Sequence, residues 1–293
     1  MTAHTRAALQ ALFVTLLWST SWVLIKIGLD DIPALTFAGL RYVLAFLCLL
    51  PLAWRSGQLG ALRRLPRADW GRLIVLGLLF YTVTQGAQFL GLERLPAATT
   101  SLLFSFTTGV VALLGIPLLG ERPTRGQWGG IAIYLVGALV YFYPVALPRE
   151  QVVGLLIMLV GVLANALSTV LGRDVNRAAT LPALAVTVAS MGVGSVVLLG
   201  TGIAVQGLPA LDARGWLIIV WLALVNTAFA FTLWNHTQRT LPAVETSIIN
   251  NTMLIQIAVL AWVFLGEALN AREIGGLALA AIGTLLVQLR RRG

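Results

Sequence analysis

An aromatic and polar stripe runs along the first apolar stretch of the chain. Trp18, Trp22 and Lys26 are spaced four residues apart, so an α-helix would place them on one face, with Ser21 close by. Such a stripe could line a wet cavity, where indole rings and an ammonium group contact a bound organic molecule. It could equally consist of interfacial tryptophans and a lysine whose ammonium reaches the membrane surface. Trp18 and Ser21 are candidate substrate-binding residues, and Lys26 is a candidate for coupling or gating.

A second stripe contains two amides. Tyr81, Gln85 and Gln88 follow one helical face at positions i, i+4 and i+7 of another apolar stretch. An amide has both donors and acceptors, so in an apolar medium it needs a partner. Either a neighbouring helix or the amino or carboxylate group of a ligand can supply that partner. We interpret these three residues as candidates for substrate binding.

The composition indicates what kind of fold positions these residues. Of the 293 residues, 58% are hydrophobic and 11% are charged, and the mean hydropathy is +0.90. These values are typical of an integral membrane protein in a lipid bilayer. The formal charge of +9 does not indicate nucleic-acid binding, because the basic residues flank apolar segments and form no patch interleaved with aromatic residues. The single cysteine, Cys48, excludes an internal disulfide.

Ten apolar segments are long enough to cross a membrane. A helix needs about 20 residues to span about 30 Å of hydrocarbon. Helices are expected because lipid offers no partner for backbone groups and the runs are too uniformly apolar for barrel strands. The expected fold is therefore all-α, with ten transmembrane helices. They span approximately 8–28, 34–54, 70–91, 97–118, 125–143, 152–172, 182–204, 214–235, 243–265 and 271–290.

The basic residues lie mostly on one side of this topology. If the N-terminus is cytoplasmic, 14 of the 20 lysines and arginines fall on the cytoplasmic side. The positive-inside rule then predicts a multi-pass protein of a bacterial-type inner membrane, with both termini in the cytoplasm. The first apolar run has no small-residue cleavage site, so we expect a retained helix rather than a signal peptide.

One stretch of the chain occurs twice. Residues 95–140 align without a gap with residues 241–286, at an offset of 146, and 15 of the 46 positions are identical. Each half would contain five helices, an odd number, so the second half must enter the membrane from the opposite side. The sequence therefore predicts two inverted repeats, residues 1–146 and 147–293. In secondary transporters, repeats of this kind enclose a midplane site that opens to either face.

The two copies differ where the second gains polar side chains. An asymmetric ligand would contact the two copies differently, whereas scaffold positions stay alike. Asn250 and Asn251 are therefore candidate substrate-binding residues, with a hydrogen-bond network between helices as the alternative. Glu245 lies near a helix start, where a carboxylate stabilises the helix dipole, and is also a candidate for coupling. Asn165 and Trp234 are further candidates for substrate binding. The differing pairs are Thr99 with Glu245, Phe104 with Asn250, and Ser105 with Asn251.

Several short motifs resemble those of a known family. They are Trp18-Ser19-Thr20-Ser21-Trp22 before Lys26, Pro33 with Arg41-Tyr42, Leu95-Pro96-Ala97, and Gly120-Glu121-Arg122, which the second copy replaces with Gly266-Glu267-Ala268. With these motifs the chain resembles the drug/metabolite transporter superfamily, specifically its EamA-type ten-helix exporters. The resemblance covers essentially the whole chain. It implies export of amino acids, aromatic ones included, or of related metabolites.

Other chemistries lack the residues that they need. There is no Walker-type loop for ATP, no cofactor motif and no His, Cys or acidic cluster for a metal. His4 and His236 have no convergent acids, so an intramembrane enzyme is only a distant alternative. A cationic drug or amine exporter would need a carboxylate in the membrane, and Glu245 is the candidate. The sequence favours a secondary transporter of amino acids or similar metabolites, and it leaves the oligomeric state open.

Overall fold

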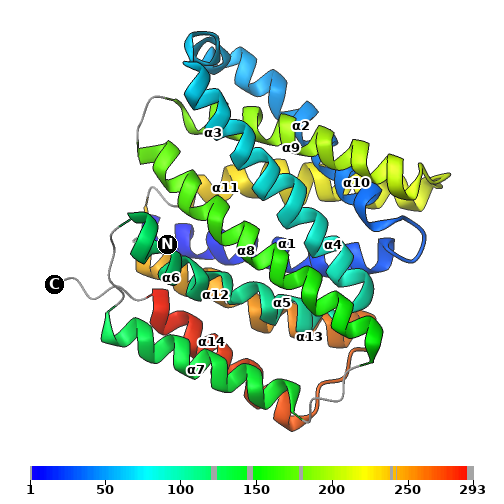
Figure 1. Ribbon diagram of the computed structural model, residues 1–293, viewed down its shortest axis with the longest axis vertical. Helices are drawn as coiled ribbons and strands as arrows, with labels where there is room; N and C mark the ends of the chain where they lie inside the picture. Colours follow the sequence, from blue (N-terminus) through cyan, green and yellow to red (C-terminus); the bar gives the residue numbers. More distant parts are fainter. Residues whose placement is uncertain are drawn as a thin grey trace.

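The computed structural model describes residues 2–119, 124–143, 148–177, 181–237, 240–241 and 243–288, and these residues form helices joined by turns (Figure 1). The first half contains α1 (Ala3–Gly28), α2 (Ala34–Arg55), η1 (Gln58–Arg64), α3 (Arg67–Gly77), η2 (Leu78–Thr84), α4 (Gln85–Arg94), α5 (Ala97–Ser105), α6 (Thr107–Leu119) and α7 (Arg125–Phe142). The second contains α8 (Arg149–Arg177), α9 (Ala183–Gln206), α10 (Ala213–Ala223), η3 (Leu224–Phe229), α11 (Ala230–Thr237), α12 (Ala243–Asn251), α13 (Met253–Leu265) and α14 (Ala271–Gln288).

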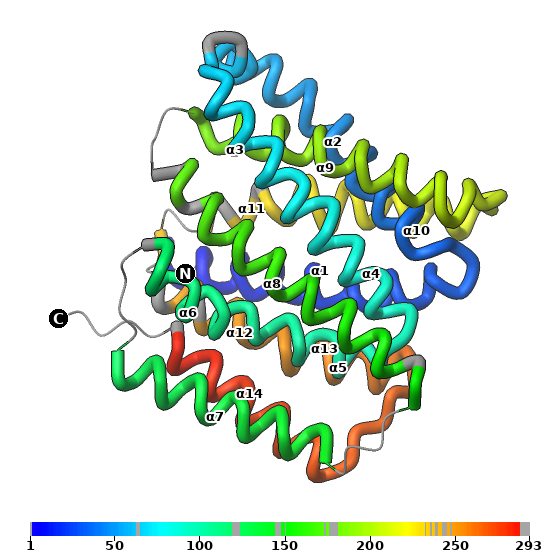
Figure 2. Tube along the Cα trace, in the orientation of Figure 1, coloured from blue at the N-terminus to red at the C-terminus, as the bar shows by residue number. Residues whose placement is uncertain are grey.

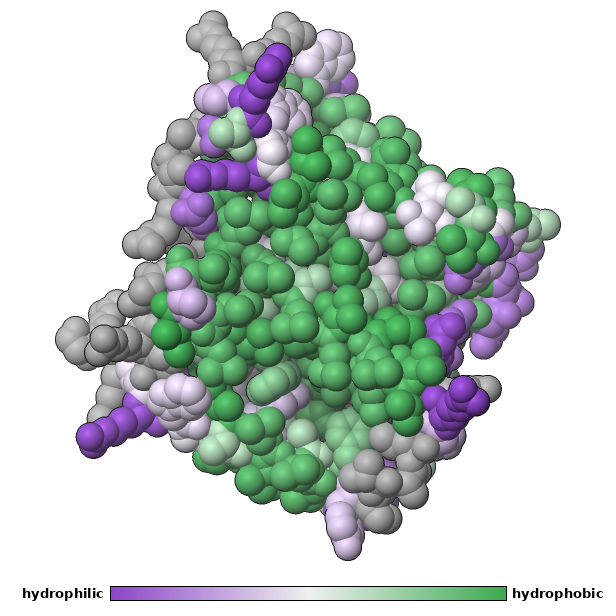
Figure 3. Space-filling model, viewed as in Figure 1, coloured by the Kyte–Doolittle hydropathy of each residue, from purple (hydrophilic) through white to green (hydrophobic). Residues whose placement is uncertain are grey.

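These helices match the ten predicted segments in order. The third segment is α3, η2 and α4 joined end to end, and the eighth is α10, η3 and α11; the fourth and ninth are each divided by a short break. Seven segments among the described residues have the length and hydropathy to cross a bilayer. Figure 3 shows apolar residues covering the middle of the visible face, with hydrophilic residues toward its left and right ends. The protein is an all-α integral membrane protein, as predicted.

The last helices of the two repeats, α7 and α14, pack side by side in opposite directions (Figure 2). A Cβ placed on Gly130 would lie 2.7 Å from the Gly283 carbonyl oxygen, and one on Gly137 would lie 2.7 Å from the Gly276 carbonyl oxygen. In the sequence repeat, Gly130 corresponds to Gly276 and Gly137 to Gly283, so exchanging the two copies reproduces the same contacts. Equivalent helices therefore run antiparallel, as inverted repeats require.

Both repeats depart from regular α-helix at equivalent places. The π-helical segments η2 and η3 begin at Leu78 and Leu224, which are separated by the repeat offset of 146. The breaks at Phe106, between α5 and α6, and at Thr252, between α12 and α13, are separated by the same offset. In a membrane such irregular backbone is tolerated only where it is buried in protein or lines a cavity. These four irregularities therefore indicate where to look for a site.

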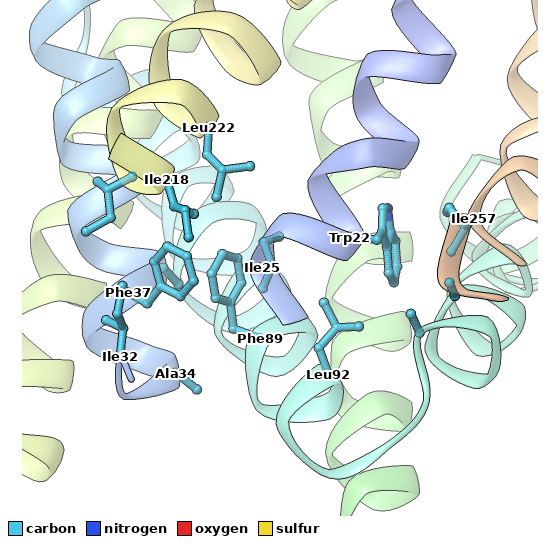
Figure 4. Close-up of a cluster of buried hydrophobic side chains, with 14 of the residues drawn as sticks. Trp22, Ile25, Ile32, Ala34, Phe37, Phe89, Leu92, Ile218, Leu222 and Ile257 are labelled. Carbon is cyan, nitrogen blue, oxygen red and sulfur yellow. The ribbon is translucent and has the colours of Figure 1, made fainter. Parts of the chain in front are cut away.

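A buried apolar cluster fixes α1 between α2, α4, α10 and α13. The rings of Phe37 and Phe89 meet edge to face with centroids 5.2 Å apart, and Figure 4 shows Ile25 of α1 beside them. Trp22, one turn earlier in α1, is part of the same cluster together with Ile257 of the second repeat. Residues of both repeats thus hold α1, which carries the first predicted stripe.

Candidate functional site

A cavity of about 260 Å³ lies between the two helix breaks. Ser105 and Thr107 flank the first break and line it, and Asn251 and Met253 do the same at the second. Side chains from α1, α8 and α14 complete the wall. The cavity is thus built from repeat-equivalent, discontinuous helices, which is the position at which secondary transporters hold their substrates.

Three of the predicted residues, Asn165, Asn250 and Asn251, line this cavity. Asn165 donates from Nδ2 to Thr107 Oγ1 at 3.2 Å, and Asn251 donates from Nδ2 to the Ala281 carbonyl at 2.9 Å. Asn250 forms no side-chain hydrogen bond with any described residue. Its amide is therefore available to a ligand, whereas the other two are each anchored to a neighbouring helix.

Part of the cavity wall is aromatic. Trp22 and Phe104 line it with their rings edge to face, 6.0 Å between centroids. Phe104 is the repeat equivalent of Asn250, so the duplicated position supplies a ring from one copy and an amide from the other. A ligand here would contact aromatic rings as well as hydrogen-bonding groups.

Sequence reasoning did not select several residues that line the cavity. Ser101, Ser105 and Thr108 share one face in the sequence, a pattern that is also typical of close helix packing, and all three line the wall. The hydroxyls of Ser101 and Ser105 each donate to a carbonyl three residues earlier in their own helix. Small hydroxyl residues serve packing and cavity lining equally well, so residue type alone could not decide. The signal that could have selected Ser105 is its repeat equivalence to Asn251.

Trp18 and Trp234 pack against each other where α1 meets α11. Neither they nor Ser21 are among the residues that line this cavity. The Trp18 and Trp234 rings are 5.0 Å apart between centroids. Trp18 Nε1 donates to the Asn226 carbonyl of η3 at 3.1 Å, and the buried Ser21 hydroxyl donates to the Trp18 carbonyl. Trp18 therefore satisfies a backbone acceptor in the π-helical segment.

The second predicted stripe faces α2. Gln85 Oε1 accepts a hydrogen bond from the Tyr42 hydroxyl at 2.7 Å, and the Tyr81 ring lies 5.6 Å from the Tyr42 ring. Gln88 is buried but forms no hydrogen bond with the described residues. The sequence left open whether a neighbouring helix or a ligand supplies the partner of Gln85, and here Tyr42 of α2 supplies it. The Gln88 amide has no hydrogen-bond partner among the described residues.

Opposite charges hold the turn between α4 and α5 from two sides. Lys26 Nζ donates to the Leu95 carbonyl at 2.9 Å, after the end of α4. Glu267 accepts from the backbone N–H groups of Ala97 and Ala98 at 2.8 and 3.3 Å, at the start of α5. Lys26 belongs to the first repeat and Glu267 to the second, so this Lys26–Glu267 clamp joins the repeats at one end of the molecule. The equivalent turn at Gly120-Glu121 lies outside the described residues.

Glu245 lies at the opposite end of α1. Its Oε2 is 2.7 Å from His4 Nε2, and both side chains are substantially exposed, 41% and 54%. The pair links the start of α1 to the start of α12. Glu245 is therefore near the surface and does not line the cavity between the helix breaks.

Inverted five-helix repeats around a cavity at paired helix breaks define the class of multi-helix membrane transporters. The chain belongs to the EamA-like transporter family, whose model matches residues 5–143 and 152–289. This match confirms the resemblance seen in the short motifs, and it makes the protein a transporter rather than an enzyme.

Relatives with assigned names match most of the chain. A probable amino-acid metabolite efflux pump of Salmonella typhimurium is 26% identical, over 93% of this chain and 91% of its own. A probable terminal-alkyne amino-acid exporter of Streptantibioticus cattleyicolor is 28% identical, over 98% and 95%. The uncharacterized inner membrane transporter YedA of Escherichia coli is 27% identical, over 95% and 87%. A crystal structure with 21% identity superposes with a TM-score of 0.67 over 96% of this chain and 97% of its own, which supports the fold.

Proposed function

We propose that this protein is a secondary transporter that exports amino acids or closely related small metabolites by alternating access. The observation that carries the proposal is the cavity between the paired helix breaks, with a free amide at Asn250 and an aromatic wall at Trp22 and Phe104. The names of two relatives, an amino-acid metabolite efflux pump and an amino-acid exporter, favour the same substrate class.

The cavity suits a small ligand with both polar and apolar parts. Its volume of about 260 Å³ is slightly below the range of about 300–1,000 Å³ for drug-sized ligands, which favours a smaller molecule. Amide donors and acceptors suit carboxylate and ammonium groups, and the aromatic faces suit an apolar or aromatic side chain. We include Asn165, Asn251 and Gln88 among the residues that bind the substrate as it moves between the repeats.

The Lys26–Glu267 clamp serves in this proposal as a gate at the non-cytoplasmic face. Its charges stabilise the end of α4 and the start of α5, in keeping with the helix dipole, and opening that face requires the two repeats to separate there. The His4–Glu245 pair occupies the other face, where α1 meets α12. Both contacts are formed in this structure, so in this proposal each face opens by breaking the contact that closes it.

The proposal includes the predicted topology. Both termini lie in the cytoplasm, and the chain divides into repeats of residues 1–146 and 147–293. The family match supports this division, because its two parts end at residue 143 and begin at residue 152. The excess of basic residues on the side of the α2–α3 connection supports a cytoplasmic location for that side.

Purified protein reconstituted in liposomes tests the substrate class. Vesicles with protein should accumulate labelled amino acid by counterflow, and protein-free vesicles should not. A panel of unlabelled aromatic, aliphatic and acidic amino acids, with simple amines, then ranks substrates by competition. If no amino acid or amine in the panel moves above the protein-free level, the substrate class is wrong.

The cationic-drug alternative makes a different prediction for Glu245→Gln. A cation exporter needs a carboxylate within the membrane, and Glu245 is near the surface with His4. We therefore expect Glu245→Gln to retain most amino-acid counterflow. Complete loss of transport, with normal membrane abundance, would instead favour a coupling role for this carboxylate.

A further inference from the structure

Arg41 is a buried cation with one weak protein partner. The residue lies in α2 and is 5% exposed. Its Nε and Nη2 both approach the same acceptor, Thr227 Oγ1 of η3, at 3.4 and 3.3 Å. None of the ion pairs formed by the described residues includes Arg41. A guanidinium within the membrane-spanning part of the protein is thus left without a carboxylate.

The hydrogen-bonding capacity of this side chain is largely unused. A guanidinium has five N–H donors in a rigid fork. Those that reach Thr227 share a single hydroxyl, which itself donates to the Leu222 carbonyl at 2.9 Å. The other N–H groups form no hydrogen bond with the described residues. If Arg41 served only helix packing, neighbouring carbonyls would be expected to take up these donors.

Other groups hold the guanidinium in a defined place. Its central carbon lies 5.1 Å from the centroid of the Tyr42 ring, a cation–π contact. The Tyr42 hydroxyl in turn donates to Gln85 Oε1, so the ring that supports Arg41 is itself oriented by α4. Positioning of this kind favours a fork that binds a planar ligand group at two atoms.

The neighbouring residue of η3 is also incompletely satisfied. Asn226 is fully buried, and its Nδ2 donates to the Leu17 carbonyl and to Thr20 Oγ1. Among the described residues, its Oδ1 is the one side-chain oxygen or nitrogen that is fully inaccessible to solvent and has no hydrogen-bond partner. Arg41, a cation without a carboxylate partner, contacts Thr227, and the adjacent residue Asn226 carries an acceptor without a partner. Both Asn226 and Thr227 belong to η3, and π-helical segments of this kind are frequent at functional sites.

We infer that Arg41, with Thr227, binds the carboxylate of the transported metabolite at a second position on its path, because neither residue lines the cavity between the helix breaks. The inference rests on the proposed function and deepens it, because it assigns a site to one ligand group. A carboxylate matches the guanidinium fork at two oxygens and supplies the negative charge that the described protein does not. The substrate class is then a zwitterion or a monocarboxylate rather than a simple amine.

The test compares an amino acid with its carboxamide, which has the same side chain and ammonium group but no negative charge at the carboxyl end. Competition against labelled amino acid is measured in proteoliposomes of the wild-type protein, Arg41→Gln, Arg41→Lys and Arg214→Gln. Arg214 is the control because it is an exposed arginine on α10, 3.9 Å from Asp31. Thermal midpoints in detergent show which variants fold.

The wild-type protein and Arg214→Gln should prefer the acid to the carboxamide by about 10- to 100-fold, the range expected for hydrogen bonds to a charged group. Arg41→Gln should remove this preference, and Arg41→Lys should reduce it. If Arg41→Gln does not fold, the assignment is tested by two other results. The wild-type protein should prefer the acid to the carboxamide, and Thr227→Val should reduce this preference.

Two results would overturn the assignment of the carboxylate site and leave the proposed transport function standing. They are equal competition by acid and carboxamide in the wild-type protein, and an unchanged preference in folded Arg41 or Thr227 variants. Absence of counterflow for every member of the panel by wild-type protein would overturn the proposed function together with this subsite.

Discussion

At the scale of single residues, the polar side chains inside the membrane fall into two groups. Gln85 and Asn251 already have partners on neighbouring helices, the Tyr42 hydroxyl and the Ala281 carbonyl. Asn250, Gln88 and Arg41 keep donors or acceptors that no described residue satisfies. Because an unpaired polar group destabilises a buried site, groups of the second kind are expected to be retained for a ligand.

Asn250 and Asn251 offer a matched pair for this distinction. Asn250→Leu should reduce counterflow at least tenfold without lowering membrane abundance or the thermal midpoint, because its amide contacts no other described residue. Asn251→Leu should also lower stability, by about 1 kcal/mol, because it removes a hydrogen bond between helices. Both effects are measured on purified protein, by counterflow and by thermal unfolding. Wild-type transport by Asn250→Leu would remove this residue from the site.

At the scale of elements, glycine decides how closely α7 and α14 approach. A Cβ on Gly130 would meet the backbone of α14 at 2.7 and 2.8 Å, and neither contact can be relieved by moving a side chain alone. A Cβ on Gly129, the adjacent residue, would have no atom within 4 Å. The two glycines therefore differ in packing although they share sequence context and helix.

Alanine substitution should separate the two. Gly130→Ala should force the helices apart and destabilise the protein by about 1–3 kcal/mol, the usual range for overpacking. Gly129→Ala should be neutral or stabilise by up to about 1 kcal/mol, since alanine favours helix over glycine. Thermal midpoints in detergent compare the variants. Equal midpoints for both would contradict the close contact between α7 and α14.

The sequence predicted the helices better than their irregularities. Apolar length marked the segments correctly, and Pro33 and Pro182 lie directly before α2 and α9, where a missing N–H costs little. The breaks at Phe106 and Thr252 carry neither glycine nor proline, so no local signal revealed them. Asn250 and Asn251 were selected as candidates because they differ from their equivalents in the first repeat copy. The partner of Gln85 could not be found, since Tyr42 is 43 residues away and meets it only through packing of α2 on α4.

At the scale of the whole molecule, the antiparallel packing of repeat-equivalent helices gives the protein two faces of similar construction. In Figure 1, α1 begins and α14 ends on the same side. One face carries the Lys26–Glu267 clamp, in which Glu267 of the second repeat accepts a hydrogen bond from Ala97 of the first. The other face carries the His4–Glu245 pair, which joins α1 to the second repeat. We expect that opening one of these two contacts while the other stays closed gives access to the cavity from one face only. Small shifts of packed helices between two stable arrangements are enough for such a change.

The orientation of these faces is tested by cysteine labelling in intact cells. After Cys48→Ser removes the native thiol, Ala210→Cys, between α9 and α10, should react with a membrane-impermeant maleimide. Ser56→Cys, between α2 and α3, should react only after the membrane is permeabilised, because the basic residues near it favour the cytoplasm. The reverse pattern would place the termini outside.

The central claim is that the substrate occupies the cavity between the paired helix breaks, and Ser105→Cys in the Cys48→Ser background tests it most directly. This substitution nearly preserves side-chain size and places a thiol on the cavity wall. The amino acid found by counterflow should slow maleimide labelling of this thiol severalfold at saturating concentration and leave labelling of Ser56→Cys unchanged. Labelling of Ser105→Cys at the same rate with and without the transported amino acid would contradict the account.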